Sequence, residues 1–111
     1  AVVRVPAEVA FGFGDNNYTL DFNADLDRLN FRELPVGTSF GRVNGSEAIP
    51  LHVRDEHDRQ VAERYFEVSQ QHLKTRLPLM PSMLTRDTTV IRQDCLCYLM
   101  ERYDAHLADA G

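Results

Sequence analysis

The spacing of apolar residues changes about halfway along the chain. From Val9 to Phe22, apolar side chains alternate with small or polar ones, as in strands that bury one face. Later, apolar residues recur at helical intervals from Asp55 to about Arg76, and again from Asp87 or Thr88 toward Ala108. This pattern predicts a β-rich first half followed by two long helices.

The first predicted hairpin lies near the start of the chain. Its strands are Val9 to Phe13 and Tyr18 to Phe22, and the intervening Gly14-Asp15-Asn16-Asn17 is rich in residues that form tight turns. Asn23 is expected to cap a short helix over Ala24 to Asn30.

A second hairpin is predicted between Thr38–Val43 and Glu47–Val53. Asn44-Gly45 suits the positive backbone angles of a type I′ turn between them. Pro50 cannot donate a ladder hydrogen bond, so the second strand should lie at a sheet edge or begin after that residue. With a short strand at Val2 to Val5, these segments predict an antiparallel sheet of about four strands.

The charges of the segment from Asp55 to Arg76 agree with a helix. Acidic residues stand in its first turn and basic residues in its last, the order that the helix dipole favours. We therefore predict one α+β domain over residues 1–111. In it, the two-hairpin sheet packs against a C-terminal pair of long antiparallel helices.

Charge limits the classes of partner. Seventeen acidic residues against 12 basic ones give a net charge of −5, which disfavours direct nucleic-acid binding. An acidic mimic of nucleic acid stays an alternative. No apolar run approaches the roughly 20 residues of a membrane span. A cytoplasmic location is expected, although a leader removed ahead of Ala1 is an open alternative.

No pattern predicts catalysis or a bound cofactor. His52 and His57 stand among three carboxylates, but four residues separate them where a helical metal site would have three. Capping of the following helix explains the carboxylates. No serine lies in a nucleophile elbow, and His72 and His106 lack a nucleophile to serve. We predict no catalytic residue, no metal ligand and no cofactor.

Two smaller features have simple interpretations. Cys95 and Cys97 are two residues apart in a predicted helix, where they cannot easily bridge each other, and we expect both to be buried. Asn17 and Asn44 each begin a glycosylation sequon at a predicted turn. Whether either is used is left open.

The segment from Leu77 to Leu84 is unusually apolar for a connection between helices. It holds two prolines and the adaptable side chains of methionine and leucine. Such a segment either binds a partner or folds over the core. Its candidate partner-binding residues are Leu79, Met80, Met83 and Leu84.

These features predict a noncatalytic protein–protein interaction module, such as an adaptor, a chaperone-like or an inhibitory protein. It would act through the helix pair and the apolar connector, with self-association as a homodimer as one form. The alternative is a small enzyme or ligand-binding protein. Its pocket, between sheet and helices, would be lined by Phe11, Phe13, Tyr65, Phe66 and Tyr98.

Overall fold

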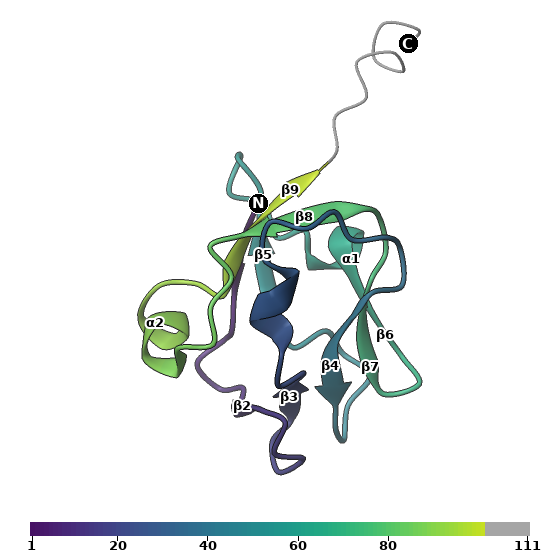
Figure 1. Cartoon of the computed structure of the whole chain (residues 1–111), viewed down its shortest axis with the longest axis vertical. Helices are drawn as coiled ribbons and strands as arrows, with labels where there is room; N and C mark the ends of the chain where they lie inside the picture. The colour runs from purple at the N-terminus through teal and green to yellow at the C-terminus, as the bar shows by residue number, and fades with distance from the viewer. Residues whose placement is uncertain (102–111) are drawn as a thin grey trace, which may run out of the picture.

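The computed structural model describes residues 1–101 and consists mainly of short β-strands (Figure 1). The longest helix in this range has six residues. The elements in chain order are β1 (Val2–Arg4), β2 (Phe11–Phe13), β3 (Leu20–Phe22), the 3-10 helix η1 (Leu26–Leu29), β4 (Ser39–Val43), β5 (His52–Arg54), α1 (Ala62–Tyr65), β6 (Phe66–Ser69), β7 (His72–Thr75), β8 (Leu79–Ser82), α2 (Thr88–Gln93) and β9 (Cys97–Glu101).

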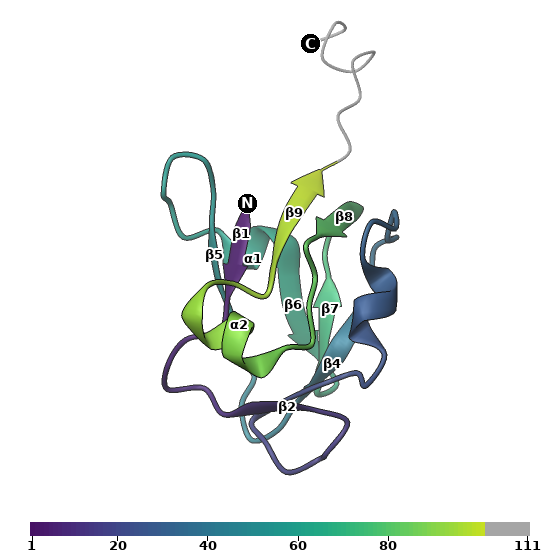
Figure 2. The ribbon, with the colours of Figure 1, turned by 60° about the vertical axis from the view of Figure 1, so that its left-hand side comes forward.

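The strands form two sheets that lie face to face (Figure 2). One is antiparallel, in the order β5-β1-β9-β8. The other has the order β2-β3-β4-β7-β6 and is antiparallel except for the parallel pair of β2 and β3. Side chains from both sheets meet in one core, among them Val3, Val53, Leu99, Phe22, Phe40 and Leu73.

The predicted α+β fold with a C-terminal helical hairpin is wrong. Where the first long helix was expected, α1 makes a single turn and the chain continues as the hairpin of β6 and β7. Gln70 and Gln71 turn this hairpin with positive φ angles of 52° and 66°. Glutamine gives no sequence signal for such a turn. Phe66, Leu73 and Thr75 are buried in the sheet, so pairing between distant residues overrides a helical spacing.

The second predicted helix is much shorter than expected. It begins as predicted, because the Asp87 carboxylate accepts hydrogen bonds from the backbone N–H of Thr89 (3.0 Å) and of Val90 (3.3 Å). It ends at Gln93, and the chain then enters β9. The expected continuation toward Ala108, with His106, lies outside the described residues.

The strands of the first predicted hairpin exist, but they pair in parallel. Leu20 N–H donates to Ala10 C=O at 3.1 Å, so the chain returns to the start of β2 instead of folding back along it. The buried Asp21 carboxylate holds the loop by accepting from Tyr18 N–H (3.3 Å) and from Asn44 Nδ2 (2.7 Å). The turn residues were predicted correctly and the pairing was not.

The second predicted hairpin is divided between the two sheets. β4 pairs with β3 and β7, whereas β5 pairs with β1. Gly45 has the positive φ (76°) that the predicted type I′ turn requires but Asn44 does not, so the chain bends at Gly45 into a longer loop and that turn does not form. β5 begins after Pro50 and lies at a sheet edge, as the proline predicted. The short helix expected over residues 24–30 is the 3-10 helix η1, which Asn23 does not cap with its side chain.

Candidate protein-interaction surface

Strand β8 occupies the segment that the sequence analysis took for an interhelical connector. Pro81 on β8 lies opposite Leu99 on β9. The backbone N–H and C=O groups of Leu99 point away from β8 and bond to Ala1. Pro81 therefore needs no N–H to pair with β9. On the other side of β8, Phe31 N–H donates to Pro81 C=O (2.7 Å) and Leu34 exchanges two bonds with Leu79. A proline therefore fits this strand, and residues 31–34 cover its outer edge.

The four predicted partner-binding residues differ in their exposure to solvent. Leu79 and Leu84 are buried, with exposures of 3% and 6%. Met80 is half-buried, and Met83, which has a positive φ of 56°, is 65% exposed. The two methionines are accessible to a partner, whereas the two leucines belong to the core.

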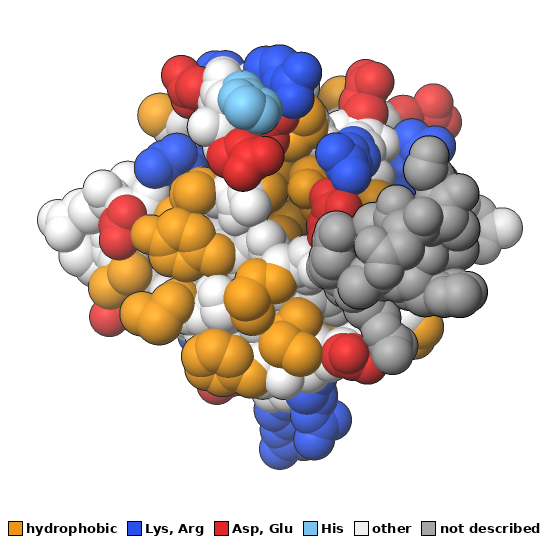
Figure 3. All heavy atoms as spheres, turned by 90° about the horizontal axis from the view of Figure 1, so that it is seen from above, with side chains coloured by type: hydrophobic (Ala, Val, Ile, Leu, Met, Phe, Trp, Pro, Cys, Tyr) orange, Lys and Arg blue, Asp and Glu red, His pale blue; other side chains and the backbone are white. Residues whose placement is uncertain are grey.

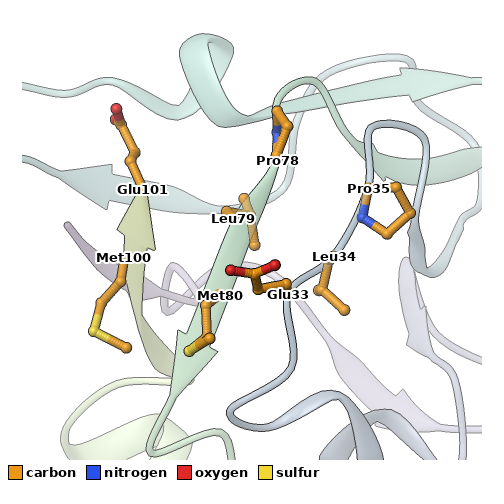
Figure 4. A pocket seen from close by; sticks show the side chains of 8 residues that line it. All are labelled: Glu33, Leu34, Pro35, Pro78, Leu79, Met80, Met100 and Glu101. Atoms are coloured by element: carbon orange, nitrogen blue, oxygen red, sulfur yellow. The ribbon is translucent and has the colours of Figure 1, made fainter. Parts of the chain in front are cut away.

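An apolar groove of about 470 Å³ lies beside β8 (Figure 4). Met80 and Met100 are directly opposed on neighbouring strands, and residues 33–35 form the other side of the groove. The lining residues are Glu33, Leu34, Pro35, Pro78, Leu79, Met80, Met100 and Glu101. Leu34 and Met100 come from distant parts of the chain and were missed from the sequence.

Further apolar side chains are exposed around this groove. Phe31 is 60% exposed, and Met100 and Tyr98 are 44% and 41% exposed. Seen from the end of the molecule at which β8 and β9 lie, hydrophobic side chains gather on the face, with charged residues around them (Figure 3). All three methionines of the chain, Met80, Met83 and Met100, belong to the segment of β8 or to β9.

Glu101 at the rim of the groove is held in place by two donors. Arg64 Nη2 donates to its carboxylate at 2.9 Å, and the Tyr65 hydroxyl donates to its other oxygen. Burial, and then the hydrogen bond to Glu101, raise the pKa of Tyr65 to about 12. The phenol therefore stays protonated as a donor at neutral pH.

The acidic segment around His57 forms a turn and does not begin a helix. Asp55 accepts hydrogen bonds from the backbone N–H groups of His57 (2.8 Å) and Arg59 (2.9 Å), and from the Arg59 side chain. The bond from the Arg59 backbone is the main cause that lowers the pKa of Asp55. Within residues 1–101, no three His, Cys, Asp or Glu side chains are grouped to hold a metal ion.

Cys95 and Cys97 are buried and free, as predicted, although Cys97 lies in a strand. Burial raises the pKa of both thiols. This is the opposite of what nucleophilic activation requires.

The two sequon asparagines differ in accessibility. The Asn44 side-chain amide donates to Tyr18 C=O (2.9 Å) and to Asp21, which gives it a structural role. Asn17 is exposed.

The residues expected to line an enzyme pocket are dispersed. Phe11 and Phe13 pack on Phe22, with ring centroids 5.8 and 5.2 Å away. Phe66 packs on Phe40, Tyr65 bonds Glu101, and Tyr98 is exposed on the other sheet. These side chains fill the core or its surface and do not surround one cavity.

No family model, curated protein or solved structure matches this chain. In the described range, no helix is long and apolar enough to cross a bilayer.

Proposed function

We propose that the chain is a noncatalytic protein-interaction module that binds through the apolar face around Met80 and Met100. The observation that carries this proposal is the opposed methionine pair beside an open groove, because these side chains stay accessible on a strand whose other face is core. Methionine and aromatic residues are enriched in protein interfaces, and methionine adapts its shape to a partner.

The backbone under this face supports binding without a large ordering cost. β8 is hydrogen-bonded to β9 on one side and to residues 31–34 on the other. Glu101 at the rim is fixed by Arg64 and Tyr65. A preorganised apolar centre with a polar rim is the usual anatomy of an interface.

Self-association is the form of binding that we propose. An isologous dimer needs one patch that carries both a hollow and side chains to fill it. Here the groove provides the hollow, and the exposed Phe31 and Met83 provide protruding apolar side chains near β8. In this arrangement, two copies of the face cover each other's apolar surface.

Light scattering after size exclusion tests this proposal. We expect the wild-type chain to be a dimer and Met100→Asp to be a folded monomer that still unfolds cooperatively, at a melting temperature that no longer depends on protein concentration. Val90→Asp is the matched control, because Val90 is 42% exposed on α2, outside the groove. A wild-type monomer at all concentrations would contradict self-association, as would equal effects of the two variants.

A further inference from the structure

Within the described residues, strand β6 has one edge that no other strand pairs with. β6 is the last strand of its sheet, at the right of Figure 1, and its only partner within residues 1–101 is β7. Arg76 N–H donates to Tyr65 C=O (2.8 Å), which fixes the register of bonded pairs. Hydrogen-bonded pairs recur at every second residue of an antiparallel ladder. The backbone groups of Glu67 and Ser69 therefore point toward β7, whereas those of Phe66 and Val68 point away from it.

The outward backbone groups of β6 are therefore those of Phe66 and Val68. Phe66 N–H is already bonded to Ala62 C=O in α1. The Phe66 C=O group and both backbone groups of Val68 are left pointing away from β7. The backbone of an added extended strand would form hydrogen bonds with these groups, because a strand's N–H and C=O groups point to alternate sides at successive residues.

Two hollows run along this edge. One, of about 700 Å³, lies between β6, α1 and residues 47–52, and the other, of about 450 Å³, lies near Gly45 and Gln70. Both are lined by Val68 and Glu47, so the two hollows adjoin at these residues. The buried side chains of Leu51 and Phe66 contribute to the lining of the larger hollow.

The charge along this edge is mainly negative. Glu47, Glu63 and Glu67 line the larger hollow and are exposed. The lining guanidinium, that of Arg76, donates to Glu63 C=O at 2.7 Å. Lys74 is paired with Glu67 but lies on β7, one strand further from the edge. Edge-to-edge pairing of two copies would bring these carboxylates together, which is unfavourable.

We infer that the open edge of β6 is a second binding site, which takes an extended segment of a partner protein rich in Lys or Arg as an added strand. Main-chain hydrogen bonds to Val68 and Phe66 supply the pairing, and the three glutamates select for basic side chains. This site is in the other sheet from Met80 and Met100, and the inference does not depend on the function proposed for those residues.

The test uses a peptide probe of alternating Lys and Val, acetyl-KVKVKVK-amide, and the same peptide with Glu in place of Lys. Binding is measured by calorimetry, and exchange of the Val68 amide by NMR. We expect the basic peptide to bind and to slow exchange at Val68. The acidic peptide should not bind.

Charge-reversal variants complete the test. Glu47→Lys combined with Glu67→Lys should weaken binding by about tenfold or more, and Glu63→Gln should weaken it less. Glu8→Lys, an exposed change outside the lining of both hollows, is the control and should bind like the wild type. The inference is overturned if the basic peptide does not bind, if Val68 exchange is unchanged, or if the control and the double variant bind equally. Met100→Asp should leave peptide binding intact, which separates this test from that of the dimer.

Discussion

Met80 and Met100 face each other across the β8–β9 ladder, while their neighbours Leu79 and Leu99 point into the core. A strand buries alternate side chains, so adjacent residues of β8 serve different purposes. Substitutions at positions one residue apart should therefore separate binding from stability.

Leu79→Ala should destabilise the fold far more than Met80→Ala. Leu79 is 3% exposed, and its truncation leaves a cavity that costs about 2–5 kcal/mol. Met80 is half-buried on the outer face, and its truncation should cost less than about 1 kcal/mol. Urea unfolding of both variants measures the difference, and equal losses would contradict the assigned faces.

Gly41→Ala should be strongly destabilising. A Cβ atom at Gly41 would overlap the Asp21 carbonyl and approach Phe22 Cα to 2.6 Å, where β3 and β4 pass closely. Relief of this overlap requires backbone movement, at a cost of about 2–3 kcal/mol. Gly37→Ala is the control, because open space surrounds Gly37 and only its φ of 86° is unfavourable. A smaller loss at Gly41 than at Gly37 would refute the close packing.

Arg92→Lys should loosen the attachment of α2 to the N-terminal segment. The guanidinium donates to Pro6 C=O (3.1 Å) and Val9 C=O (2.6 Å), and it lies 4.5 Å from the Phe11 ring centroid. A lysine cannot keep this fork of donors, and we expect a loss of about 2 kcal/mol in unfolding free energy. Arg86→Lys, whose guanidinium lies over the Phe13 ring at 5.4 Å, should cost less. Chemical denaturation compares the two.

Alkaline pH should reduce stability through Cys97 and Tyr65. Both groups have raised pKa values in the fold, so the folded state keeps protons that the unfolded chain releases. Stability should fall as pH rises above the ordinary thiol value of 9.0, and Tyr65 adds to this between 10.0 and about 12. Denaturant titrations of Cys97→Ala should show a shallower decline above pH 9. An identical decline would count against a buried thiol.

Both thiols should also react slowly with an aromatic disulfide reagent in the native protein. Burial excludes the reagent and keeps the thiols protonated. The rate should rise sharply in denaturant. Fast labelling under native conditions would mean that β9 opens easily.

Local signals in the sequence predicted part of this fold. The start of β5 after Pro50 and the start of α2 near Asp87 are each determined by a few neighbouring residues. The choice of strand partners is not determined locally, because β4 pairs with β7 and β5 pairs with β1 although these strands are far apart in the sequence. The helix predicted at residues 55–76 failed because its apolar spacing fits both structures, and the turn at Gln70-Gln71 has no sequence signature.

The candidate surface was located only in part. The apolar segment indicated Met80 and Met83, but Met100 reaches the groove through the long-range pairing of β8 with β9. One signal was available, since Cys97 and Leu99 alternate with Tyr98 and Met100 as in a half-buried strand.

The most direct test of the interaction surface is NMR of ¹³C-methyl-labelled methionine across a dilution series. The three methionines of the chain are all at or near this face, so each signal reports on it. The proposed dimer predicts that the Met80 and Met100 methyl signals of the wild type shift with protein concentration, whereas the Met80 signal of Met100→Asp stays constant. Signals that stay constant from dilute to concentrated wild-type protein would contradict self-association through this face.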